Sequence, residues 1–173
     1  KLSPNEKFLV ASSGNKAYLM DMNGRRLNVL DAHSRPINSV DISNDGKYIL
    51  TGSMDNTTRI WNLNGETLHV MHEHTGAVEA CRFSPRSRHI VTAARDGKLL
   101  LWDKQGNFIR TIENLKGDIY DARFSPDGTY ILAGFDNHEA RLYNLRGKQI
   151  QAFSHQWEKV PAVNFSNNGK QIL

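Results

Sequence analysis

The sequence predicts an all-β fold built from a repeated unit of four short strands, and three observations indicate it. A large side chain recurs every 41 residues, at Met20, Trp61, Trp102 and Tyr143. A serine recurs with the same period, at Ser43, Ser84, Ser125 and Ser166. Short apolar segments alternate with Gly, Asp and Asn turn signals, and no amphipathic helical pattern interrupts them. Independent series that share one period indicate an internal repeat.

The unit at residues 33–73 illustrates the first two expected strands. Residues 37–42 form the first strand, because apolar residues stand there at positions that can face a core. The turn Asn44-Asp45-Gly46 ends this strand, since Asp and Gly adopt turn geometry at little cost. The next segment, residues 48–51, is a largely apolar run, which favours a strand that is buried on both faces.

The third and fourth strands follow a tight turn. This turn falls at residues 55–56, and the equivalent turns are expected at 96–97 and 136–137. The third strand ends at Trp61, and the fourth strand includes Met71. The same order divides the chain into units at about 1–32, 33–73, 74–114 and 115–155, with a further unit that begins at 156–173.

A four-stranded unit of about 41 residues has the size of one β-propeller blade. The chain resembles the WD-repeat (WD40) β-propeller family along its whole length, with repeats of the bacterial style. The family's Trp-Asp dipeptide stands as Trp102-Asp103, and its Phe-Ser-Pro-Asp-Gly turn stands at residues 124–128. The resemblance implies blades of four antiparallel strands. Because rings of this family close with seven or eight blades, we expect about four blades of a longer ring, cut within a blade at each end.

The resemblance also implies that a hydrogen-bonded tetrad of His, Ser or Thr, Asp and Trp holds each blade. The matching side chains are His33, Thr51, Asp55 and Trp61 in one unit and His74, Thr92, Asp96 and Trp102 in the next. A buried polar group is costly unless it is paired, so a closed network favours one packing arrangement. The flanking units depart from the pattern, and we expect them to be softer, at Met20, Leu115, Ala133 and Tyr143.

No constellation of residues predicts catalysis, so we expect no enzyme activity, no cofactor and no metal. The repeated carboxylates occupy turns, and Cys81 belongs to an apolar series of the repeat. His69, His72 and His74 could share a metal, but His74 belongs to a tetrad and the other two fall at a strand end and in its loop. The sequence contains no phosphate loop, dinucleotide fingerprint or nucleophile elbow.

Composition and charge argue against several classes of partner. Lys and Arg number 22 against 18 Asp and Glu, so the positive charge is small and scattered, which does not favour nucleic acid. The densest basic patch is Arg82, Arg86 and Arg88. No apolar run reaches the roughly 18 residues of a membrane-spanning helix, so we expect no membrane partner. A single cysteine fits a reducing compartment, and we expect a cytoplasmic location.

Surface recognition is the remaining chemistry, because a propeller holds its loops on a rigid scaffold. In the family, partner contacts often come from the top face, through the residues that flank the first apolar position of the first strand and through the residue before the tight-turn Asp. The matching residues are Pro36, Asn38, Met54, Ala77, Glu79, Arg95, Asp118, Tyr120, Phe135, Lys159 and Pro161, with Trp157 in a nearby loop. Met, Arg and aromatic side chains are common interface anchors.

Two functions remain open. The first is a non-enzymatic scaffold that binds a protein or peptide through the top face, with the remaining blades of the same propeller as a further partner. The alternative is a sensor or regulatory segment of a larger bacterial signalling NTPase of the STAND type, or of a protease. This alternative rests on a similarity of style, since segments such as Asn62-Leu63-Asn64-Gly65 follow the Trp position in every unit.

Overall fold

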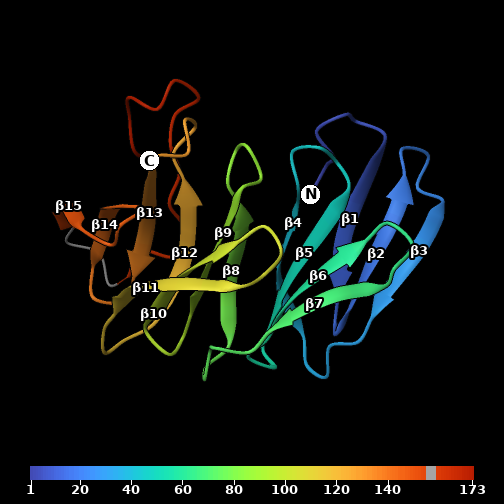
Figure 1. Cartoon of the computed structure of the whole chain (residues 1–173), viewed down its shortest axis with the longest axis horizontal. Coiled ribbons are helices and arrows are strands. Elements are labelled where there is room, and N and C mark those ends of the chain that lie inside the picture. Colours follow the sequence, from blue (N-terminus) through green and yellow to red (C-terminus); the bar gives the residue numbers. More distant parts are fainter. Residues whose placement is uncertain (155–158) are drawn as a thin grey trace.

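The computed structural model of the chain describes residues 1–154 and 159–173. In these residues fifteen strands and no helix occur, and the strands form four antiparallel sheets (Figure 1). The prediction of an all-β fold built from four-stranded antiparallel units is confirmed, although the first sheet has three strands. We number the sheets first to fourth along the chain.

Each sheet is a meander in which every strand pairs with its neighbours in sequence. The first sheet holds β1 (Phe8–Ser13), β2 (Lys16–Asp21) and β3 (Arg26–Asp31). The second holds β4 (Ile37–Ile42), β5 (Tyr48–Ser53), β6 (Thr58–Asn62) and β7 (Thr67–Met71). The third holds β8 (Val78–Phe83), β9 (His89–Ala94), β10 (Lys98–Asp103) and β11 (Phe108–Asn114). The fourth holds β12 (Ile119–Phe124), β13 (Tyr130–Phe135), β14 (Glu139–Asn144) and β15 (Gln149–Ser154).

The four sheets stand side by side in an open arc, and the ring of blades is not closed (Figure 1). Neighbouring sheets touch through their first strands, because β4 contacts β8 and β8 contacts β12. The loops before these strands and the tight turns between second and third strands gather at one edge of the arc, which is the top face. In the orientation of Figure 1 this face is the lower edge.

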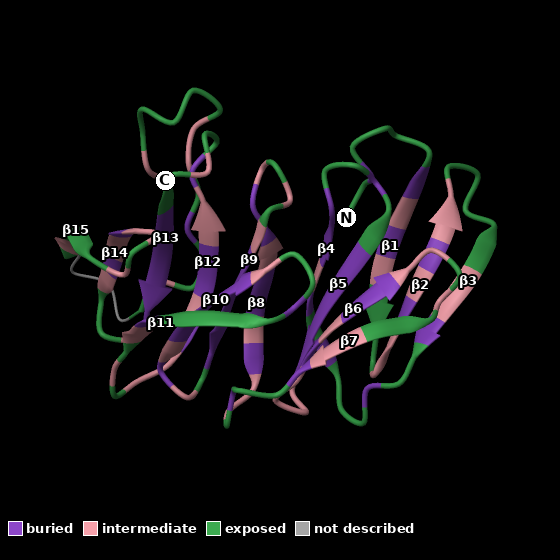
Figure 2. Cartoon of the chain, viewed as in Figure 1, coloured by how far each residue is buried: buried purple, intermediate pink, exposed green. Residues whose placement is uncertain are grey.

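The hydrophobic core lies between the sheets. Ile49 of β5 belongs to a cluster with Val10 of the first sheet, whereas the next residue, Leu50, belongs to a cluster with Phe83 of the third sheet. Ile49 and Leu50 are both fully buried, because successive side chains of a strand point to opposite faces. The apolar run at residues 48–51 predicts this double burial, and Figure 2 shows β5 buried along most of its length.

The tight turns between the second and third strands fix the register of the repeat. In the turns of the second, third and fourth sheets one residue takes a positive φ, namely Asn56 at 69°, Gly97 at 74° and His138 at 68°. These three residues are 41 apart, so the turn of the fourth sheet falls at residues 137–138. The expected turn at 136–137 is therefore wrong by one residue. Asp136, just before the turn, resembles the Asp that begins the other two turns. His138 stands where a Gly or Asn, which favours a positive φ, would mark the turn.

Candidate partner-binding surface

A series of hydrogen bonds between four side chains supports the top face of the second sheet. Trp61 Nε1 donates to Thr51 Oγ1 at 2.8 Å, and Thr51 Oγ1 lies 2.7 Å from His33 Nε2. His33 Nδ1 lies 2.7 Å from the carboxylate of Asp55 in the tight turn. Burial lowers the pKa of His33; burial opposes ionisation of Asp55, but hydrogen bonds from Thr57 and His33 hold the pKa of Asp55 below its usual value. A neutral imidazole therefore donates its Nδ1–H to a charged carboxylate.

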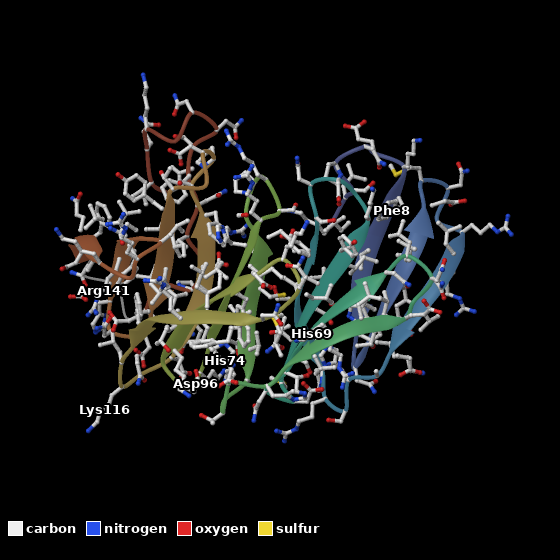
Figure 3. All side chains as sticks on the ribbon, in the orientation of Figure 1. Phe8, His69, His74, Asp96, Lys116 and Arg141 are labelled. Carbon is white, nitrogen blue, oxygen red and sulfur yellow. The ribbon has the colours of Figure 1, made fainter. Side chains whose placement is uncertain are left out.

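The third sheet repeats this arrangement. Trp102 Nε1 donates to Thr92 Oγ1 at 2.9 Å, Thr92 Oγ1 lies 2.7 Å from His74 Nε2, and His74 Nδ1 lies 3.1 Å from Asp96. Burial opposes ionisation of Asp96, but the hydrogen bond and electrostatic interaction with His74 and the backbone hydrogen bonds from Thr75 and Lys98 together outweigh it and lower the pKa of Asp96 to about 2. Each tetrad thus ties the loop before a first strand to a tight turn, and Figure 3 shows His74 and Asp96 together near the lower edge.

The fourth sheet uses a different link, which the sequence reasoning missed. Tyr143 OH donates to Glu113 Oε2 at 2.7 Å and so joins β14 to β11 of the third sheet. Arg141, labelled in Figure 3, lies 3.6 Å from the same carboxylate and 2.6 Å from Glu139, and its guanidinium stands 5.1 Å from the centre of the Phe135 ring. One and two periods before Glu113 the sequence holds a His and an Asp, so periodicity does not reveal this link.

Five of the predicted contact residues form two sets of contacts on the top face. Arg95 Nε lies 2.6 Å from Glu79 Oε1 and 3.9 Å from Asp118 Oδ2 of the next sheet. Lys159 Nζ lies over the Tyr120 ring, 5.5 Å from its centre. The hydrogen bond with Glu79 raises the pKa of Arg95, and smaller electrostatic contributions come from Asp118 and Tyr120. We call these five side chains the top-face cluster.

Other predicted contact residues lie on the same face outside this cluster. Pro36 and Asn38 are exposed and Met54 is half-buried. The Met54 N–H donates to the Pro36 carbonyl at 2.9 Å, and Asn38 Nδ2 donates to the Val78 carbonyl of the third sheet at 3.2 Å. The first bond joins two loops of the second sheet, and the second bond links β4 to the third sheet. Of two further predicted contact residues, Ala77 is half-buried and Pro161 is exposed.

Phe135 is wrongly placed among the predicted contact residues. Its ring is 1% exposed in the core between the third and fourth sheets, so a partner cannot reach it. The backbone bond that marks the contact position recurs in three sheets, from Met54 to Pro36, from Arg95 to Ala77 and from Asp136 to Asp118. Asp136 therefore occupies this position in the fourth sheet, and its side chain is half-buried. Trp157 lies outside the described residues.

The described residues give little support for a metal site, a reactive thiol or a membrane-spanning helix. No group of three or more His, Cys, Asp or Glu side chains suited to a metal occurs among them. His74 is engaged in its tetrad, and His72 is exposed. Cys81 is fully buried, and burial raises the pKa of its thiol to about 12, so the thiol stays protonated. No helix in the described ranges is long and apolar enough to cross a membrane.

Comparison with known proteins points to one family. The family described as WD domain, G-beta repeat matches residues 24–62, 65–103 and 106–144, which together make up more than half of the chain. No curated protein matches the chain. WD40 repeats generally mediate protein–protein interactions as scaffolds, and proteins built from them are typically non-catalytic. The matched repeats and the antiparallel four-stranded sheets agree, and the chain belongs to the WD-repeat (WD40) family.

Proposed function

We propose that the chain is a non-enzymatic scaffold that binds a protein or peptide through its top face. The observation that supports this function is the top-face cluster, in which Arg95 lies between carboxylates of two neighbouring sheets. The Arg95 side chain is 47% exposed, whereas Glu79 is only 15% exposed, so the carboxylate orients a guanidinium that still faces solvent. Arg and Tyr are frequent interface anchors because each combines apolar contact with directional polar groups.

The chemistry of Arg95 indicates what a partner offers to it. The Arg95 contacts with Glu79 and Asp118 go through Nε, and within the described residues its two Nη groups make no hydrogen bond. The Nη groups of such a guanidinium can donate hydrogen bonds to a second, planar acceptor, such as a carboxylate or a pair of carbonyls. The Tyr120 ring of the same cluster, which Lys159 covers, supplies an apolar surface. A partner segment with a carboxylate next to an apolar side chain therefore suits this cluster.

Photo-crosslinking tests which face the partner uses. A photoreactive aromatic amino acid is placed at Tyr120 on the top face, and at Tyr130, which lies at the opposite end of the fourth sheet and is exposed. We expect an adduct from the Tyr120 position in cell extract and not from Tyr130. Adducts of equal yield from both positions would remove the support for the top face.

Substitutions of Arg95 and Tyr120 then test whether these two residues contact the partner. For the partner identified by crosslinking, Arg95→Glu and Tyr120→Ala are expected to weaken binding by about tenfold or more, as interface anchors do. The control is Arg25→Glu, a change of equal charge in the exposed turn between β2 and β3. Circular dichroism melting checks that all variants fold. If both top-face variants bind like the control, the proposed function fails.

A further inference from the structure

A second surface lies away from the top face, between the second and third sheets. A cavity of about 470 Å³ opens there, lined by the β4–β5 turn, the β8–β9 turn and the start of the β10–β11 turn. Figure 1 shows the first two of these turns at the upper edge of the arc, opposite the top face. The cavity is lined by four cationic side chains, which we call the basic quartet: Lys47, Arg86, Arg88 and Lys104.

The described residues neutralise the basic quartet only in part, through the electrostatic interaction of Lys47 with Asp45. Within the described residues no hydrogen bond or ion pair involves the charged group of any of its four side chains, whereas Arg82, Arg95 and Arg141 all form ion pairs. Asp45 is the carboxylate that lines the cavity, and its pKa is lowered by the Ser43 hydroxyl, so it is charged. The cavity nevertheless keeps a clear excess of positive charge.

The β8–β9 turn departs from the repeat at this place. The equivalent turn of the fourth sheet reads Pro-Asp-Gly at residues 126–128, whereas this turn reads Pro85-Arg86-Ser87. Ser87 takes a φ of 48°, a conformation that favours glycine, and Gly128 has a φ of 76° in the equivalent position. An Arg thus replaces an Asp in a turn that retains backbone strain.

A second cavity with a mixed polar and apolar lining lies beside the first. A neighbouring cavity of about 320 Å³ shares Tyr48 and Lys104 with the first and is lined by Ile60, Leu68 and His69. Leu68 is 49% exposed, so its side chain is available to a ligand. The two cavities share two lining residues, the first is basic and the second contains the exposed Leu68, and we call the pair the inter-sheet groove. Figure 3 labels His69 in the middle of the arc.

We propose that the inter-sheet groove binds an extended peptide segment in which a phosphorylated Ser or Thr stands close to an apolar side chain. A phosphate carries about −1.5 to −2 charges at neutral pH, which matches a cluster of unpaired cations better than a single carboxylate does. Guanidinium groups bind phosphate oxygens in a bidentate manner. The exposed Leu68 of the second cavity then contacts the neighbouring apolar side chain. A nucleic acid has no apolar side chain for this cavity.

Fluorescence anisotropy with labelled peptides tests this site. The probe is a ten-residue peptide with phosphoserine two residues before a leucine, compared with the same peptide carrying serine and with one carrying alanine in place of leucine. We expect the phosphorylated, leucine-containing peptide to bind about tenfold or more tightly than either comparison peptide, because each removes one end of the match. Equal binding of the three peptides would overturn the proposal, as would preferential binding of a labelled single-stranded DNA.

A matched pair of variants locates the binding. The double variant Arg86→Asp with Ser87→Gly gives this turn the Pro-Asp-Gly sequence of residues 126–128, so it is compatible with the fold and relieves the strain at position 87. We expect it to lose about tenfold or more in phosphopeptide affinity while its melting temperature is unchanged or higher. The control Arg25→Asp removes one exposed cation from the first sheet and keeps the affinity. Similar affinities for the double variant and the control would place the binding elsewhere, and this result is independent of the top-face proposal.

Discussion

At the scale of single residues, each tetrad threonine is a small side chain that forms hydrogen bonds with two larger buried ones. Thr92 Oγ1 accepts from Trp102 Nε1 and lies 2.7 Å from His74 Nε2, so one hydroxyl satisfies two buried ring nitrogens. Removing this hydroxyl leaves two buried ring nitrogens without this partner.

We expect Thr92→Val to lower the free energy of unfolding by about 2–4 kcal/mol, since each buried group left without a partner costs about 1–3 kcal/mol. Valine keeps the shape, so the change isolates the hydroxyl. Urea denaturation followed by circular dichroism measures it. The control is Thr111→Val in β11, where the threonine is exposed and the change is expected to stay within about 0.5 kcal/mol. A Thr92→Val variant as stable as this control would show that the tetrad is not a stabilising network.

At the scale of elements, periodicity predicts the strands well and the irregular links poorly. The strand expected at residues 37–42 is β4, because apolar spacing and turn residues act locally and agree with each other. The tight turn of the fourth sheet was missed by one residue, since a His takes the positive φ that Gly or Asn usually signals. Because the turn was placed one residue too early, Phe135 was predicted as the contact residue before it, although Phe135 is a core residue. The top-face cluster depends on side chains of two sheets meeting, which spacing along one chain does not determine.

The link between β11 and β14 shows how a sheet without the tetrad is held. Tyr143 is almost fully buried, and burial raises the pKa of its hydroxyl, which therefore stays protonated and donates to Glu113. We expect Tyr143→Phe to lower the free energy of unfolding by about 1–3 kcal/mol, because hydrogen bonds to charged groups lie near this range. A double-mutant cycle with Glu113→Gln measures the coupling. Strictly additive effects of the two changes would mean that the hydroxyl and the carboxylate do not stabilise each other.

At the scale of the whole molecule, stability is expected to vary from sheet to sheet. In repeat proteins each unit is stabilised by its own interactions and by its contacts with neighbours. The third sheet has a tetrad and core clusters on both faces. The fourth sheet has no tetrad, and its outer face borders a cavity of about 920 Å³. Leu142 on that face is half-buried, whereas the equivalent Leu101 of the third sheet is 2% exposed.

Native-state hydrogen exchange tests this gradient on the 173-residue chain. We expect the amides of β9 and β10 to exchange about tenfold or more slowly than those of β2, β14 and β15, since local opening is easiest where burial and polar networks are fewest. We expect the first sheet to exchange like the fourth because it also lacks the tetrad, with Met20 in place of Trp. The Thr92→Val change should reduce the difference by accelerating exchange in the third sheet alone. Uniform protection across all four sheets would instead mean that the arc unfolds as one cooperative unit, and the tetrads would then stabilise the whole molecule rather than their own blades.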